Sequence, residues 1–159
     1  METTCFSSPV GMLRITGSIN GIRSVTFEDN VQESNAHPPV LMECVRQLDE
    51  YFKGERFQFT LPLDAEGTEF QKRVWEQLAK IPYGETLSYL ELSQRIGNPE
   101  AIRAVGHANG QNKLNILIPC HRVIGSNGAL TGYGGGLWRK KWLLQHEAGK
   151  RIMGLFQNI

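Results

Sequence analysis

Apolar residues in the first part of the chain recur with the two-residue period of β-strands. Residues 22–27 alternate apolar and polar side chains, and a looser alternation runs through residues 6–19. Asn20 and Gly21 lie between the two runs, and an Asn-Gly pair in this position is a strong hairpin signal because both residues tolerate a positive φ. The pattern therefore predicts strand and turn within residues 6–27.

A helical stripe follows these strands. Residues 29–39 are polar and acidic and end in two prolines, which indicates a loop. Apolar side chains in residues 40–52 then recur every three or four positions up to Gly54, which favours an amphipathic helix. Cys44 lies on this stripe and is interpreted as a core residue. Residues 57–61 predict one more strand, so the whole part reads as a small α+β unit in which nothing suggests chemistry.

The helical period returns after a plausible linker at residues 63–67. Thr68 and Gln71 form a capping-box pattern, in which each side chain bonds the backbone N–H of the other residue. Apolar side chains then recur at helical spacing, which predicts a helix through Lys80.

Two short helices are expected next. The first begins at Thr86 or Ser88 and ends at Gly97, and Pro99 begins the second, which covers residues 101–109. Two short helices joined by a glycine turn are typical of a helix-turn-helix, whose second helix reads DNA. This second helix is rich in small residues, which favours binding with little sequence preference. A buried helix packed against its neighbours is an equally good interpretation.

Chemistry is suggested where the apolar run of residues 115–124 is interrupted by Pro119, Cys120 and His121. Proline cannot donate to a sheet ladder or continue a helix, so it marks a chain reversal or a sheet edge. A cysteine is nucleophilic only as the thiolate, and a neighbouring histidine or cation lowers its pKa. The alternative is a structural cysteine beside a satisfied core histidine.

The end of the chain predicts a glycine-rich loop and one more helix. Residues 134–136 are three successive glycines, which mark either a mobile surface loop or a backbone that approaches something closely. A helix is expected over residues 137–147, closed by Gly149. Its basic run, residues 139–141, is interpreted as a solvated face that is also able to meet phosphate. Residues 150–159 form a short tail to which no role is assigned.

Composition and charge narrow the classes of protein. With 159 residues and 40% apolar content, the chain is expected to form one domain or two small ones, and no apolar run has the roughly 18 residues that span a membrane. Three widely spaced cysteines make no disulfide framework, which favours a reducing compartment. The net charge of +1 divides into +6 over residues 100–151 and −5 over the rest. A basic C-terminal half suits binding to a phosphate backbone, and an ordinary solvated face is the alternative.

The motif Pro119-Cys120-His121-Arg122-Val123, with Asn112 before it and Gly132-Tyr133 after it, resembles the acceptor motif of the O6-alkylguanine-DNA alkyltransferases. The resemblance extends from about Thr68 to Glu147. It implies a small N-terminal α+β domain with a ribonuclease-H-like sheet over residues 1–63. It also implies a C-terminal helix-turn-helix domain of winged-helix-like type over residues 68–159, so the fold class is α+β.

The resemblance implies roles for four catalytic residues. Cys120 is the thiolate that takes the alkyl group, His121 is its base acting through a water, and Glu147 orients the histidine. Tyr89 matches the tyrosine that donates a proton toward N3 of guanine. From sequence alone, Glu147 is equally an exposed residue at a helix C-terminus, and Tyr89 is equally a core aromatic residue.

DNA-binding and base-pocket roles are implied for seven further residues. Arg103, on the reader helix with Ala104, matches the arginine that fills the gap left by the flipped-out base in the minor groove. Asn112 matches the asparagine that joins the reader helix to the acceptor strand, although it is equally an ordinary turn residue. The remaining members of the set line the pocket or the DNA face: Arg122, Val123, Tyr133 and Gly134. Many relatives carry serine at the position of Gly134, which leaves only its backbone N–H for guanine O6.

The implied activity is direct reversal of O6-alkylguanine damage, and possible repair of O4-alkylthymine, with one irreversible reaction per protein molecule. No cofactor and no metal are expected; Cys5 and His37 are too isolated to indicate a zinc site. The expected partner is double-stranded DNA, bound without sequence specificity by a monomer in the cytoplasm, or in the nucleus of a eukaryote. Three alternatives are a non-catalytic lesion-binding protein, a cysteine hydrolase and a helix-turn-helix transcriptional regulator.

Overall fold

The computed structural model describes the backbone of residues 1–157 and the side chains of residues 1–149. Contacts divide the chain into two compact units. The first unit comprises Met1–Glu66 together with Lys113–Leu117, and the second comprises Gly67–Asn112 and the chain from Ile118 onward. Each unit is described by itself.

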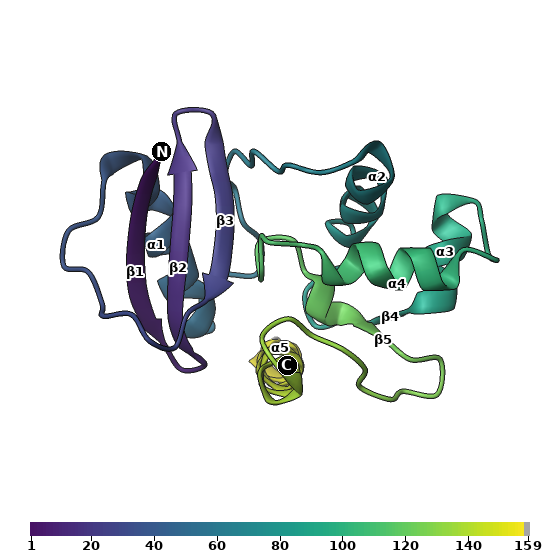
Figure 1. Cartoon of the computed structure of the whole chain (residues 1–159). Coiled ribbons are helices and arrows are strands. Elements are labelled where there is room, and N and C mark those ends of the chain that lie inside the picture. The colour runs from purple at the N-terminus through teal and green to yellow at the C-terminus, as the bar shows by residue number, and fades with distance from the viewer. Residues whose placement is uncertain (158–159) are drawn as a thin grey trace. The chain divides into compact units, whose positions relative to one another are not determined.

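The first unit is a three-stranded antiparallel sheet with one helix (Figure 1). Strands β1 (Glu2–Ser8), β2 (Gly11–Ser18) and β3 (Gly21–Phe27) lie in the order β1-β2-β3, and the turn between β2 and β3 falls at the predicted hairpin. Helix α1 (Pro39–Phe52) follows the predicted helical stripe. Its buried side chains pack on the apolar face of the sheet, and the core they form contains Phe6, Leu13, Ile15, Val25, Leu41, Cys44, Leu48 and Tyr51.

The strand predicted over residues 57–61 is wrong. Residues 57–61 have no strand conformation, and Phe57 is 48% exposed. A side chain, and not a strand ladder, bonds the backbone here, since Thr60 N donates to Gln47 Oε1 at 3.0 Å. The segment pairs with the sheet only after these residues, at an isolated parallel bridge between Ile22 of β3 and Leu63.

A short segment from the middle of the chain completes the edge of this sheet. Val25 N donates to Lys113 O at 2.8 Å, and Asn115 N donates back to Val25 O at 3.1 Å. Ile116, which follows, is 1% exposed and has φ 73°, a conformation that β-branched residues rarely adopt. This strained position therefore lies four residues before Cys120.

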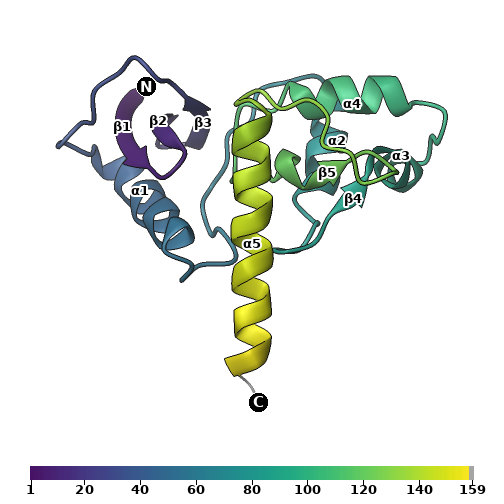
Figure 2. The same cartoon turned by 90° about the horizontal axis from the view of Figure 1, so that it is seen from below.

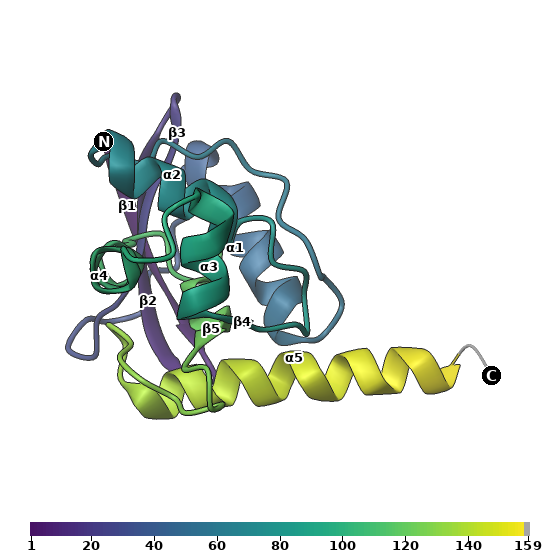
Figure 3. The same cartoon turned by 90° about the vertical axis from the view of Figure 1, so that its right-hand side faces the viewer.

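The second unit contains the helix-turn-helix. Helix α2 (Glu69–Leu78) begins with the predicted capping box of Thr68 and Gln71. Helix α3 (Tyr89–Ile96) begins with a capping box at Ser88 and ends at Gly97, which has φ 90°. Helix α4 (Ile102–Gly110) follows, and the three helices pack around a shared core (Figure 3). That core is made by Val74, Trp75, Leu78, Leu92, Val105 and Ala108.

Pro99 does not begin the second of these helices. It lies in a turn, where Ala101 N donates to Asn98 O at 3.0 Å, and α4 starts only at Ile102. The predicted span of residues 101–109 agrees with α4 to within one residue, and only the placement of Pro99 in its first turn is wrong.

The rest of the second unit presents the acceptor segment. The 3₁₀ turn η1 (Cys120–Arg122) leads into β5 (Val123–Ile124), which pairs in parallel with β4 (Leu87–Ser88). The last helix, α5 (Leu137–Gln157), continues through Gly149 as one uninterrupted helix (Figure 2). The predicted end at Gly149 is therefore wrong, because a glycine stops a helix by adopting the left-handed conformation and inside a helix it only weakens it.

Candidate functional site

Three consecutive side chains of the second unit are buried in the single turn η1. Cys120 is 5% exposed, His121 0% and Arg122 6%. Pro119 leaves the chain without a donor at this point, and Cys120 N and Arg122 N close tight turns onto Ile118 O (2.8 Å) and Pro119 O (3.0 Å). The turn therefore carries a thiol, an imidazole and a guanidinium into the interior together.

Glu147 of α5 is the partner that His121 and Arg122 share. Its carboxylate Oε2 lies 2.7 Å from His121 Nε2, and the Arg122 fork donates from Nε to Oε1 at 2.8 Å and from Nη2 to Oε2 at 3.1 Å. Glu147 is 1% exposed. Burial opposes its ionisation, but the charges and hydrogen bonds of His121 and Arg122 outweigh burial and lower its pKa. The carboxylate is thus an anion held by His121 and Arg122, which lie 26 and 25 positions earlier in the chain.

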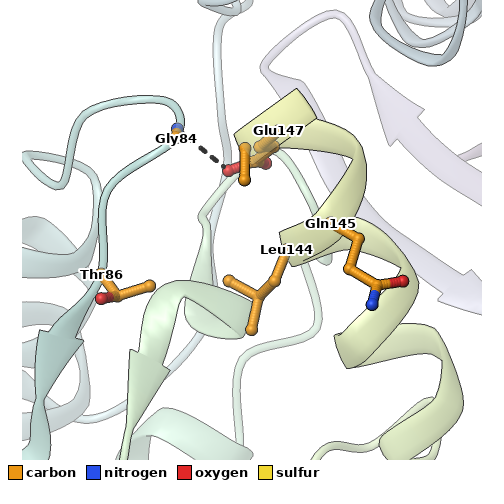
Figure 4. Close-up of a pocket in the computed structure, with 6 residues that line it drawn as sticks. Gly84, Thr86, Leu144, Gln145 and Glu147 are labelled. Atoms are coloured by element: carbon orange, nitrogen blue, oxygen red, sulfur yellow. Dashed lines mark hydrogen bonds between the residues drawn. The ribbon is translucent and has the colours of Figure 1, made fainter. Parts of the chain in front are cut away.

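Glu147 also lines a small cavity of the second unit (Figure 4). It has a volume of about 270 Å³ and a mostly apolar wall that includes Leu144 and Ala148 of α5. Gly84 N points at Glu147 Oε1 from 3.4 Å across one edge, as the dashed line in Figure 4 shows. Glu147 belongs to the wall of this cavity and Cys120 does not.

His121 is held in one tautomer by this arrangement. Burial lowers its pKa, and the charge of Glu147 only partly offsets this effect, so the imidazole is neutral. A neutral imidazole that donates Nε2–H to Glu147 has a lone pair on Nδ1. Among the described residues Nδ1 has no hydrogen-bond partner. The ring is therefore prepared to accept one proton at Nδ1.

Cys120 is positioned by two asparagines. Asn112 Nδ2 donates to Ile118 O at 2.8 Å, and Asn109 Nδ2 approaches Cys120 O at 3.5 Å from the last turn of α4. Burial raises the pKa of the Cys120 thiol, while a hydrogen bond from Asn112 and the charge of Lys140 act in the opposite direction. The resting group is a protonated thiol beside a base and a cation, which is a latent nucleophile.

The interpretation of Lys140 as part of a solvated face is wrong. Its side chain is fully buried, and Nζ donates to Thr131 O at 2.8 Å and lies 5.8 Å from the Tyr89 ring centroid. Burial lowers the pKa of Lys140, and Cys120 raises it. A signal was present, because residues 140 and 147 are two helical turns apart and so share one face of α5.

Arg139 is the second member of the basic run that is not solvated. It is 7% exposed, with Nη1 donating to Gly135 O at 3.1 Å and the guanidinium 4.7 Å from the Trp138 ring centroid. Only Lys141 of the run is exposed. Arg139 and Lys140 together fix the glycine-rich loop to α5 through its carbonyl groups.

The remaining predicted residues lie around the acceptor turn or on α4. Tyr89 OH donates to Thr131 O at 3.3 Å, and Val123 is fully buried. Burial raises the pKa of Tyr133 well above its ordinary value, and Cys120 adds to the effect. Gly134 is exposed, and a Cβ built on it meets no atom within 4 Å. Arg103 and Ala104 are exposed on α4 and contribute nothing to the buried cluster.

Among the described residues, no group of three or more His, Cys, Asp or Glu side chains is arranged to hold a metal ion. In the same part of the chain no helix has the length and apolar character needed to cross a membrane.

Comparison with known families places this chain. Residues 69–149 match the 6-O-methylguanine DNA methyltransferase, DNA binding domain, and residues 1–65 match the ribonuclease-like domain of the same family. The two matches leave little of the described chain uncovered. The chain belongs to the 6-O-methylguanine DNA methyltransferase family, and the predicted family and mixed α+β fold are confirmed.

Individual relatives agree over nearly the full length. A methylated-DNA–protein-cysteine methyltransferase of Mycolicibacterium paratuberculosis is 47% identical over 152 residues, which is 92% of each chain. One from Methanosarcina acetivorans is 46% identical, over 92% of this chain and 98% of its own. The crystal structure of Mycobacterium tuberculosis OGT in complex with DNA superposes with a TM-score of 0.87 at 43% identity, over 94% of both chains.

Proposed function

We propose that this protein repairs alkylated DNA by moving an alkyl group from O6 of guanine to Cys120, once per molecule. The observation that carries the proposal is a buried cysteine with a neutral histidine and an anionic glutamate behind it, in a domain of this family. The relatives are named for transfer to a protein cysteine, which is the same chemistry.

The transfer is a displacement at the alkyl carbon. The Cys120 thiol gives its proton toward Nδ1 of His121, and Glu147 stabilises the imidazolium that forms, as in hydrolase triads. The sulfur–carbon bond forms while the carbon–O6 bond breaks, and its electron pair passes into the purine ring. The ring takes up a proton at N3, for which Tyr89 is the proposed donor. The thioether is stable, so the thiol does not return and no cofactor is required.

Lys140 is proposed to assist the same step. A thiolate buried at Cys120 is costly without a compensating charge, and the Lys140 ammonium supplies one from α5. Because Lys140 also binds Thr131 O, it ties the thiolate to the loop that carries Tyr133 and Gly134. Val123, Tyr133 and Gly134 are proposed to line the pocket for the flipped-out base.

DNA is proposed to meet the exposed face of α4, in the minor groove and without sequence specificity. Arg103 and Ala104 are exposed there, and Asn109 and Asn112 at the end of the same helix hold the acceptor turn. Arg103 fills the space of the extruded base. The protein is proposed to act as a monomer, in the cytoplasm or, in a eukaryote, the nucleus. Repair of O4-alkylthymine is a second proposed substrate class.

The test is intact-mass measurement after incubation with a duplex oligonucleotide that carries one O6-methylguanine. The expected result is a gain of one methyl group on the peptide containing Cys120, saturating at one per protein, and no gain in Cys120→Ala. Unchanged mass with retained DNA binding would favour a lesion-binding protein. Turnover of many substrate molecules per protein would favour a hydrolase, and either result would overturn the proposal.

A further inference from the structure

Arg122 uses its whole guanidinium inside the second unit. Nε and Nη2 hold both oxygens of Glu147, and Nη1 donates to Ile81 O at 2.6 Å. The guanidinium carbon lies 5.7 Å from the centroid of the Tyr83 ring. With all three nitrogens engaged and 6% of its surface exposed, Arg122 is poorly placed to contact a DNA phosphate. This setting differs from that of Arg103, which is exposed on α4.

Arg122 also sets the charge balance of the cluster. Glu147 carries one negative charge and touches both His121 and Arg122, but only the guanidinium is charged at every pH that a protein tolerates. The other charged group that acts on His121 is Lys140 on α5, and Tyr83 lies against Arg122. Arg122 is therefore the group that compensates the carboxylate while His121 stays neutral.

We propose that Arg122 is a positioning residue of the acceptor site, which fixes and neutralises Glu147 so that Nδ1 of His121 stays open to accept the thiol proton. The proposal rests on the proposed function. It assigns Arg122 to the proton path and not to the DNA surface.

Loss of the guanidinium would change the protonation of the pair. Without Arg122, an uncompensated carboxylate buried against an imidazole takes up a proton at higher pH. If the imidazole holds that proton, both ring nitrogens carry hydrogen. If the carboxyl group holds it and donates to Nε2, the neutral ring carries its hydrogen on Nδ1. In both forms Nδ1 cannot accept the thiol proton. The fall of the transfer rate at acidic pH, called the acid limb below, must therefore move to higher pH.

The experiment compares Arg122→Gln, Arg122→Lys and Arg103→Gln with the parent, and uses Arg46→Gln as a control at a surface fork in the first unit. Single-turnover transfer rates are measured against pH, and DNA affinity is measured against salt. For Arg122→Gln we expect the acid limb to rise by about 1 to 2 pH units with DNA affinity unchanged. Arg122→Lys keeps the charge but loses the bidentate contact, so we expect a smaller rise of its acid limb than in Arg122→Gln. Arg103→Gln weakens DNA binding without moving the limb.

A second readout does not depend on alkyl transfer. NMR titration of the His121 ring in the protein without DNA should show the same upward shift in Arg122→Gln and a smaller one in Arg122→Lys. If Arg122→Gln does not fold, the Lys variant decides by both readouts. An unmoved titration and pH limb, together with weaker and less salt-dependent DNA binding, would overturn the proposal in favour of a DNA contact. If the titration moves but no variant transfers an alkyl group, the proposed function fails and the positioning role stands.

Discussion

Two arginine forks in this protein hold a carboxylate in the same bidentate way and differ in nearly everything else. Arg46 grips Glu43 within α1, and their side chains are 54% and 49% exposed. Arg122 grips Glu147 across 25 residues, and their side chains are 8% and 1% exposed. Both carboxyl groups have a lowered pKa, to about 2 for Glu43, where the hydrogen bond from Arg46 is the main cause.

The difference teaches what each fork is for. At the surface, water and salt screen the charges, so a pair like Arg46–Glu43 has little influence on stability. In the interior the desolvation of both ions consumes much of the attraction between them, so a buried pair is a poor way to add stability. A buried fork beside a cysteine and a histidine is better explained by the chemistry that it prepares.

The largest expected contrast comes from removing each carboxylate. Glu147→Ala leaves the Arg122 guanidinium buried without a counter-charge, and we expect the free energy of unfolding to fall by about 3–5 kcal/mol. Alkyl transfer to Cys120 should also be lost. Urea denaturation and single-turnover kinetics measure the two effects. Glu43→Ala is the matched control, for which both measurements should match the parent, and an equal loss in the two variants would contradict the comparison.

A smaller effect separates two adjacent lysines of α5. Lys140→Met removes the buried cation whose charge lowers the pKa of Cys120, whereas Lys141→Met removes an exposed one. We expect Lys140→Met to raise the Cys120 pKa and to slow transfer roughly 10-fold, the effect of about one pKa unit. The rate of thiol alkylation by iodoacetamide against pH reports the pKa directly. Equal behaviour of the two variants would show that Lys140 does not act on the thiol.

The loss of stability in acid should respond differently to salt at the two arginine–carboxylate pairs. The folded pKa values of Glu147 and His121 lie below the ordinary 4.5 and 6.5, so the unfolded chain binds more protons as pH falls through these values. Stability from both groups is therefore present above the ordinary values and is lost at lower pH. Unfolding measured between pH 7 and 3, at low salt and in about 1 M salt, should show that the loss persists in the parent.

The matched variants assign that loss. Glu147→Gln should remove the part of the loss that begins below the ordinary carboxyl pKa of 4.5, at both salt concentrations, while the part that comes from buried His121 remains. Glu43→Gln should change it only at low salt, where the surface pair is unscreened. Sensitivity to salt in both variants would mean that the Glu147 site is open to water.

The two forks also show how much the sequence could predict. Glu43 and Arg46 lie three residues apart on a helix that apolar spacing already predicts, so their pairing is a local property. Cys120 and His121 are predicted as candidates because they are adjacent and carry a family motif. The cap at Thr68 is predicted because capping is local, whereas the pattern leaves the next helix start open between Thr86 and Ser88. These parts of the fold and site follow from neighbours in sequence.

The rest depends on contacts between distant residues. The burial of Lys140 and Arg139 requires the glycine-rich loop to fold back onto α5, and a basic run alone is typical of a solvated face. Residues 57–61 have a strand-like pattern, but their backbone bonds the side chain of Gln47. Lys113 joins the edge of β3 from 88 residues away, a pairing that no local pattern announces. The pairing of Arg122 with Glu147, 25 residues further along the chain, has no local signal either.

The smallest effect is expected at Gly134, which the proposed function places in the pocket for the flipped-out base. A Cβ there meets no atom within 4 Å, so Gly134→Ser should leave the thermal midpoint unchanged. The added hydroxyl supplies one more hydrogen bond near guanine O6 and takes up space beside the alkyl group. We expect transfer of a methyl group to rise by a few-fold, as one extra hydrogen bond allows, and transfer of a benzyl group to fall. Competition between O6-methylguanine and O6-benzylguanine oligonucleotides measures the ratio. An unchanged ratio would mean that residue 134 does not face the leaving group, and that the backbone of this loop alone sets the size of the pocket.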